Sequence, residues 1–387
     1  MKNGENETQL DQQLNSNNLD IRRGISGASQ FNADVEEYLR QAIGKKKKSL
    51  IPFALESPAI MELGRHLKRG LTGSVGTAYQ YVWSIEQYCQ WREATPDQLV
   101  KQCLTPEGQE DYKALDLEAK RLDDYIGYLQ HMGYSPGHVL NIVKAIKALF
   151  RENSCTLKPR HTPKKRTVTK DRAPRPEEIA RLVDVADLRG KVIVTMMVLG
   201  GFREGTLCKL RYRHVKEDLE RNIVPLHIHV EAEITKGRYC DYDTFIGKEA
   251  VDYLKAYLQM RRTGELPNKI SPEQINDESP LIRDEHKKEV KPITEGQCYN
   301  ILKRYLTQAG LRGTKVKGRY TMRPHTFRKY FKTQLTALRV PSDYIEYMMG
   351  HTISTYQDVE SKGVEFLRDT YHNSGFSIKP QTTTQER

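Results

Sequence analysis

Apolar positions recur with a helical period along residues 63–152. In the segment 77–91 they return every three or four residues, which is the spacing of an amphipathic helix. This stripe consists of Val82, Ile85 and Cys89. Because such a stripe must be buried against other elements, the pattern predicts a small helical domain, which we place at residues 60–154.

A later helix of this domain has a start signal and a clear apolar face. Ser135 is suited to cap its N-terminus, and Pro136 follows at a position where a missing N–H is harmless. The apolar face consists of Val139, Ile142, Val143, Ile146 and Leu149. We expect the preceding helix to end at residues 131–133, so that a short turn joins the two.

Three segments lack this periodicity. Residues 1–55 are rich in Asn, Gln, Glu and Lys and contain the run Lys45 to Lys48, which predicts a mostly disordered region, or one partly helical when bound. Residues 155–174, rich in Pro, Lys and Arg, predict an interdomain linker. The polar tail at residues 379–387 is also expected to be disordered.

A second domain is expected at residues 175–378. The apolar run 192–199 predicts a buried helix, whereas residues 228–234 and 239–245 have strand character. The remaining segments favour helices. The predicted fold class is therefore mainly α with a small antiparallel β-sheet, in two domains, which agrees with a length of 387 residues.

Composition narrows the function classes. Hydrophobic residues make up 37% of the chain and no run of eighteen apolar residues occurs, so neither a membrane span nor a secretory signal is expected. The six cysteines are scattered, without the close spacing of a zinc site or a disulfide framework. We therefore expect a cytoplasmic protein with reduced thiols and no bound metal.

Positive charge is concentrated in two segments. The net charge of +12 indicates a polyanionic partner, either nucleic acid or an anionic membrane surface. Residues 155–175 hold eight Lys or Arg and a single carboxylate, Asp171, and residues 302–332 hold ten Lys or Arg and no carboxylate. A merely solvated surface would intersperse both signs, so the distribution favours phosphate contacts.

Two basic side chains stand at sharp turns. Arg203 follows Gly200 and Gly201 and opens a helix, where its planar fork can join backbone donors on a phosphate. Lys236, with Gly237, is predicted to form the turn between the two strands and to project an ammonium group. Each residue alone is more often a solvated surface cation.

Two histidines and a tyrosine follow near the C-terminus. Pro324 precedes a predicted helix that places His325 and Arg328 on one face, a pair suited to a phosphate in a proton-transfer reaction. The alternative is that His325 caps or packs and Arg328 is solvated. Ser342 is expected to cap a short helix that ends at Gly350, after which come His351 and Tyr356.

The order of these residues resembles the tyrosine recombinase, or phage integrase, family over residues 65–378. The resemblance implies a helical core-binding domain and a catalytic domain that close as a C-shaped clamp on double-stranded DNA. It implies that Arg203 and Arg328 hold the scissile phosphate, that His325 and His351 assist proton transfer, and that no metal, cofactor or ATP is needed. Lys236 would protonate the departing 5′ oxygen, a role that Lys248 fits less well.

The nucleophile is open between two tyrosines. Tyr356 comes five residues after His351, closer than is usual in the family, and Tyr371 comes twenty residues after it. We favour Tyr356, because a shortened loop explains its spacing and because Tyr371, on an amphipathic segment, is suited to packing.

The resemblance also implies an assembly and leaves alternatives. A recombinase of this family works as a tetramer on paired DNA sites, in some cases with accessory DNA-bending proteins, and would be found at the nucleoid. The alternatives are a non-catalytic DNA-binding regulator on the same fold and a relaxing enzyme similar to type IB topoisomerases. The variant spacings look most similar to integrases of archaeal mobile elements.

Overall fold

The computed structural model describes residues 33–69, 74–164, 171–237, 240–264, 271–313, 315–316, 319–353 and 358–378. The chain divides into two compact units, Met1–Val168 and Thr169–Arg387, here called the N-terminal and C-terminal units. This division falls inside the stretch that the sequence predicts as a linker. No helix in the described part of the chain is long and apolar enough to cross a membrane.

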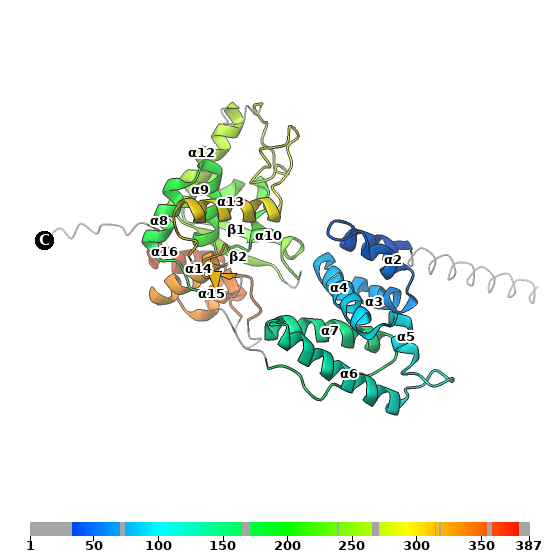
Figure 1. The fold of residues 1–387 in the computed structure, drawn as a ribbon. Helices are drawn as coiled ribbons and strands as arrows, with labels where there is room; N and C mark the ends of the chain where they lie inside the picture. Colours follow the sequence, from blue (N-terminus) through cyan, green and yellow to red (C-terminus); the bar gives the residue numbers. More distant parts are fainter. Residues whose placement is uncertain are drawn as a thin grey trace, which may run out of the picture. The chain divides into compact units, whose positions relative to one another are not determined.

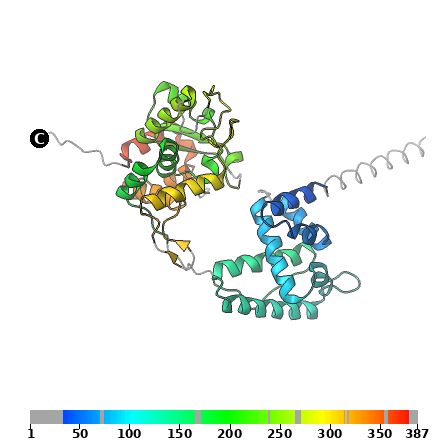
Figure 2. The ribbon, with the colours of Figure 1, turned by 45° about the horizontal axis from the view of Figure 1, so that its top comes forward.

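The regular secondary structure in the described part of the N-terminal unit is helical, apart from one isolated bridge (Figure 1). Its helices are residues 33–44, α2 (Leu50–Leu55), α3 (Pro58–Arg69), α4 (Val75–Arg92), α5 (Pro96–Lys101), α6 (Tyr112–His131) and α7 (Pro136–Glu152). Figure 2 shows the cyan α4 running across the pair formed by α6 and α7. One apolar core lies between these helices.

The predicted features of α4, α6 and α7 are confirmed. Val82, Ile85 and Cys89 of α4 are buried, α6 ends at His131, and the side chain of Ser135 accepts a hydrogen bond from the backbone N–H of His138 at the start of α7. Each helix therefore begins or ends where the local capping chemistry indicates.

The prediction that residues 1–55 are mostly disordered is wrong for residues 33–55. Val35 and Leu39 are fully buried, and they pack so closely on Gly64 of α3 that an added Cβ there would lie 3.0 to 3.1 Å from them. Lys47 forms an ion pair with Glu86 of α4. The low average apolar content of the region concealed a short amphipathic stripe. Residues 1–32 and the predicted tail at 379–387 lie outside the described residues.

The C-terminal unit carries the predicted small sheet among helices, which confirms the predicted fold class. Its α-helices are α8 (Pro176–Val185), α9 (Leu188–Leu199), α10 (Glu204–Leu207), α11 (Lys216–Arg221), α12 (Lys248–Thr263), α13 (Glu295–Gln308), α14 (Thr326–Ala337), α15 (Ser342–Met348) and α16 (Val364–Asn373). Its 3-10 helices are η1 (Tyr212–His214), η2 (Ala232–Ile234) and η3 (Glu360–Lys362). Its strands are β1 (Leu226–Val230), β2 (Tyr242–Ile246), β3 (Lys315–Val316) and β4 (Arg319–Tyr320).

Strands β1 and β2 and helix α9 determine the position of the candidate active site described below. Strands β1 and β2 pair antiparallel, and every residue of β2 is buried. Residues 192–199 of helix α9 are all buried, as the sequence predicts, and the helix packs against α12, α14 and β2 (Figure 1). The turn that follows α9 therefore emerges in the middle of the unit. The short pair β3 and β4 was not predicted, because two-residue strands leave no period to detect.

Candidate active site

The turn after α9 directs Arg203 into the interior of the C-terminal unit. Gly201 has φ +66°, and an added Cβ would lie 2.8 Å from the ring of Phe331, so both the backbone and the space require glycine. The hydroxyl of Thr244 on β2 donates to the carbonyl of Gly200 at 2.9 Å. Arg203 is the N-cap residue of α10, and its guanidinium donates to the carbonyl of Gly350 at 3.4 Å.

Arg328 lies beside it, buried on α14 with 3% of its surface exposed. Its guanidinium donates to the backbone carbonyls of Gly201 and Met349, the latter at 2.7 Å, and to Nε2 of His351 at 3.0 Å. Burial, and next the positive charge of Arg203, lower the pKa of Arg328 to about 10. The arginine stays charged at neutral pH, although its surroundings disfavour the charge.

The two guanidinium groups form a cation pair without a counterion. Among the described residues, neither Arg203 nor Arg328 forms an ion pair with a carboxylate. Backbone carbonyls satisfy part of their hydrogen-bonding capacity but cannot neutralise two positive charges. An anion with several acceptor oxygens, such as a phosphate, would relieve this repulsion and complete the hydrogen bonds.

His351 completes this group. It follows Gly350, which has φ +62°, at the end of α15, and its Nδ1 forms a hydrogen bond with the carboxylate of Glu346. Because Arg328 donates to Nε2, the ring accepts there and must donate from Nδ1. Burial lowers the pKa of His351, Glu346 opposes this effect, and the two arginines lower the pKa further, so the net shift is downward. The ring is therefore neutral at physiological pH.

His325 is the N-cap residue of α14, and its backbone angles, φ −58° and ψ −22°, are helical. The predicted spacing of three residues between His325 and Arg328 at the start of this helix is therefore present. The two side chains differ in burial, because His325 is exposed whereas Arg328 is buried. Partial burial lowers the pKa of His325, and the charges of Arg328 and Arg323 lower it further, against the opposing charge of Asp171.

Lys236 lies in the connection between β1 and β2. The predicted two-residue turn is wrong, because β1 ends at Val230, β2 begins at Tyr242, and the connection contains η2. Lys236 is exposed and forms no hydrogen bond or ion pair with another described residue. Its neighbours at residues 238–239 lie outside the described residues. Lys248, by contrast, begins α12 and pairs with Asp252.

The two candidate tyrosines differ in what the structure describes. Tyr356 lies outside the described residues. Tyr371 of α16 is 2% exposed, donates to the carbonyl of Leu199 at 2.8 Å and packs against Phe245 and Phe376. Burial raises the pKa of Tyr371 above its ordinary value. The predicted packing role of Tyr371 is confirmed, and its hydroxyl is occupied.

Two carboxylates next to these residues were missed by sequence reasoning. Glu346 holds His351 and also pairs with Lys332. Asp171 pairs with Arg323, and its backbone carbonyl accepts from Lys329 at 2.8 Å. A signal was available for Asp171, because it is the single carboxylate in a basic segment. Glu346 gave none, because its helix is too short to show a period.

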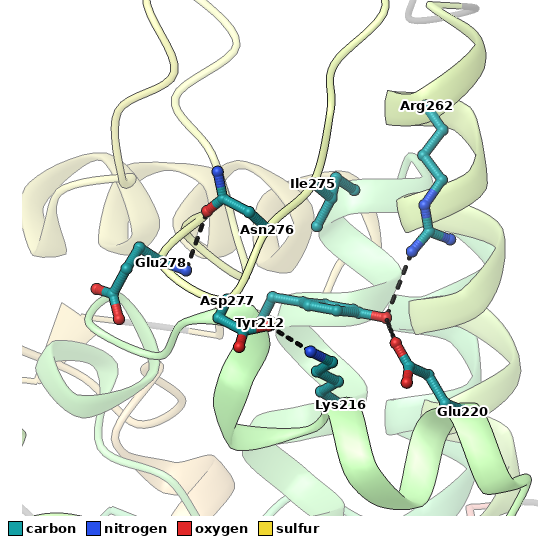
Figure 3. Close-up of a pocket in the computed structure, with 8 residues that line it drawn as sticks. All are labelled: Tyr212, Lys216, Glu220, Arg262, Ile275, Asn276, Asp277 and Glu278. Atoms are coloured by element: carbon teal, nitrogen blue, oxygen red, sulfur yellow. Dashed lines mark hydrogen bonds and ion pairs between the residues drawn. The ribbon is translucent and has the colours of Figure 1, made fainter.

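Another pocket lies among α11, α12 and the segment after α12, and it contains none of the predicted site residues (Figure 3). Its volume is about 610 Å³. Lys216 pairs with Asp277 at 2.8 Å, and the hydroxyl of Tyr212 links Glu220 and Arg262. Its charges are thus mutually satisfied and leave little demand for a ligand. The described residues contain no group of three His, Cys, Asp or Glu side chains that could hold a metal ion.

Comparisons with known proteins identify a family profile and solved structures that this chain resembles. The profile of the phage integrase family matches residues 174–358. The site-specific recombinase XerH, solved with a palindromic difH substrate as a post-cleavage complex, is 17% identical, with 88% of this chain and 90% of that chain covered and a TM-score of 0.50. XerA recombinase is 19% identical, with 81% and 97% covered and a TM-score of 0.37. No curated protein sequence matches the chain.

Proposed function

We propose that the chain, which matches the phage integrase family over residues 174–358, cuts and rejoins DNA at specific sites through a phosphotyrosine link. The main support for the proposal is the cation pair of Arg203 and Arg328. Arg328 is buried, and neither arginine is paired with a carboxylate among the described residues. A pair of this kind is complementary to a phosphate that gains negative charge in the transition state.

The proposed chemistry assigns one role to each side chain. The hydroxyl of Tyr356 attacks the scissile phosphorus, and the phosphorus–oxygen bond to the 5′ oxygen breaks. Arg203 and Arg328 stabilise the charge on the non-bridging oxygens. The neutral ring of His351 lies beside the same arginines, and its Nε2, an acceptor that faces Arg328, is suited to assist removal of the nucleophile's proton.

His325 and Lys236 act at the two ends of the reaction. The lowered pKa of His325 leaves its ring neutral and able to take the proton of the tyrosine. The exposed ammonium of Lys236 gives a proton to the departing 5′ oxygen. Because the phosphodiester energy is kept in the phosphotyrosine, the reverse attack by a 5′ hydroxyl rejoins a strand without ATP.

The proposed partner is double-stranded DNA, with a tetramer on paired sites and accessory DNA-bending proteins in some contexts. XerH, whose fold this chain shares, was solved on a palindromic substrate after cleavage. The two units are proposed to close as a C-shaped clamp on a duplex. A protein with this role would lie at the nucleoid in the cytoplasm.

A nicked suicide duplex that traps the covalent intermediate tests the proposal. Wild-type protein is expected to form a protein–DNA adduct that denaturation does not remove, Tyr356→Phe to form none, and Tyr371→Phe, the matched control, to form it. Mapping the cross-linked peptide identifies the tyrosine directly. DNA binding without an adduct in the wild type would indicate a regulator, and relaxation of supercoiled DNA lacking paired sites would indicate a topoisomerase.

A further inference from the structure

We propose that Asp243, buried in β2, is a positioning residue that sets the place of His351 by holding Tyr347 of α15. The proposal deepens the proposed function and rests on it, since His351 lies on the cation pair that would hold the phosphate. It adds to that function a link between the sheet and the helix that ends beside the site.

Asp243 is an acceptor for three donors from two elements. The hydroxyl of Tyr347 donates to its Oδ2 at 2.7 Å, while Nε2 of His227 and Nδ1 of His229 lie 2.7 and 2.9 Å from its Oδ1. Burial raises the pKa of Asp243, but the hydrogen bonds from these three side chains outweigh burial and lower the pKa to about 2. The carboxylate is therefore ionised and fully engaged at physiological pH.

Tyr347 lies close to the site along the chain. It stands in the last turn of α15, three residues before Gly350 and four before His351. Tyr242, the neighbour of Asp243 on β2, packs its ring on Gly350 so closely that an added Cβ would lie 2.4 Å from Cε1 of the ring. Two consecutive residues of β2 thus fix the end of α15 and the glycine from which His351 projects.

The same strand also holds the turn of Arg203. Thr244, the next residue of β2, donates to the carbonyl of Gly200. Three consecutive residues of one strand therefore brace the two segments that carry Arg203 and His351. A directional hydrogen bond to a buried carboxylate restricts the position of α15 more narrowly than apolar packing does.

Stability alone is a weak reason for this arrangement. An ionised carboxylate costs free energy to bury, and well-packed apolar groups often replace buried ionic clusters without loss. The carboxylate of Asp243 lies at the point where β1, β2 and α15 meet. Because it must accept hydrogen bonds from side chains of both β1 and α15, it favours one arrangement of these three elements.

The test is the rate constant of single-turnover cleavage on the nicked suicide duplex, with protein in saturating excess. Tyr347→Phe, which removes only the hydroxyl, is expected to lower this rate constant about tenfold with unchanged DNA affinity. The matched control is Tyr330→Phe on α14, since the buried hydroxyl of Tyr330 has no hydrogen-bond partner among the described residues. Because protein is in excess over DNA, a partial loss of folded protein leaves the rate constant unchanged as long as the folded fraction still saturates the DNA.

A double-mutant cycle identifies the route of the effect. If Tyr347 acts through His351, Tyr347→Phe is expected to change the rate constant less than about twofold in a His351→Ala background. An unchanged rate constant for Tyr347→Phe in the wild-type background would overturn the proposal, as would a full tenfold loss in the His351→Ala background. Absence of any adduct with wild-type protein would instead overturn the proposed function.

Discussion

Two pairs of arginines in the C-terminal unit differ in how their positive charge is compensated. In the first group, Arg261 and Arg283 share the carboxylate of Glu273, with Nε of Arg261 and Nη1 of Arg283 each 3.0 Å from its Oε2. All three side chains are at least 96% buried. Arg261 also donates to the backbone carbonyls of residues 280 and 281.

In the second group, Arg328 is equally buried, but it has only carbonyls and a neutral imidazole as partners. Its nearest cation, Arg203, adds repulsion in place of compensation. The difference separates structural from functional arginines. Arg261 and Arg283 share a carboxylate, and their ion pairs hold the segment after α12 in place. Backbone carbonyls orient the guanidinium of Arg328 but do not neutralise it, so its charge is available to bind an anionic ligand.

Glu273→Ala is expected to produce the largest change in stability. The substitution leaves Arg261 and Arg283 buried without a counterion, which should lower the free energy of unfolding by about 3 to 5 kcal/mol. Denaturant unfolding measures this change. The single-turnover cleavage rate constant of the remaining folded protein should stay at the wild-type value, and a selective loss of that rate would break the comparison.

Arg328→Lys, in contrast to Glu273→Ala, is expected to lower the rate constant of cleavage. The ammonium of lysine keeps the charge but cannot contact a phosphate and two carbonyls at once, so the cleavage rate constant should fall about 100-fold, or about 2.7 kcal/mol in barrier height. DNA affinity should change much less. A variant that cleaves at the wild-type rate would remove Arg328 from the proposed mechanism.

The sequence predicts the elements of the fold well where the apolar period is long. The apolar face of α7 and the buried run 192–199 of α9 were predictable because each spans two or more turns. Residues 33–55 were misread because average composition outweighed a short stripe that includes Val35 and Leu39. The connection between β1 and β2 was predicted too short, since no local signal marks the 3-10 turn η2.

For the candidate site, residue identity was more predictable than geometry. The double glycine before Arg203 and the glycine before His351 are visible in the sequence, and both have positive φ where they adjoin the site. The burial of Arg328 and the exposure of His325 were not predictable, because burial depends on packing against distant elements that the local pattern does not specify. Long-range partners such as Asp243 depend on strand register, which the sequence alone left open.

Glu204→Gln tests an unpaired carboxyl next to the cation pair. Burial, and next repulsion by Glu295, raise the pKa of Glu204 from 4.5 to about 7. Between these two pH values the unfolded chain ionises the group while the folded protein keeps it protonated, so stability is lost as pH rises through this window.

The size of that loss is about 3 kcal/mol. Glutamine should abolish this part of the pH dependence and make the protein more stable than wild type at pH above 7, as measured by denaturant unfolding at several pH values. A protonated Glu204 also leaves the charge of Arg203 uncompensated, as the comparison requires. An unchanged pH slope in the variant would mean that Glu204 is ionised in the folded protein.

Lys248→Ala is expected to produce the smallest change, and it extends the comparison to lysines. Lys248 pairs with Asp252 one helical turn away, with 77% of the lysine and 55% of the aspartate side chain exposed, so its loss should cost at most about 0.5 kcal/mol. Cleavage should be unaffected.

Lys236→Ala, which removes a lysine without a described partner, should slow cleavage at least about tenfold. A substrate with a 5′ sulfur at the scissile position should restore that rate, because a thiolate leaves without being protonated. The opposite result would be that Lys248→Ala slows cleavage and that the sulfur substrate restores the rate. Lys248 would then be the general acid, and an ion pair with a carboxylate would not distinguish structural from functional cations in this protein.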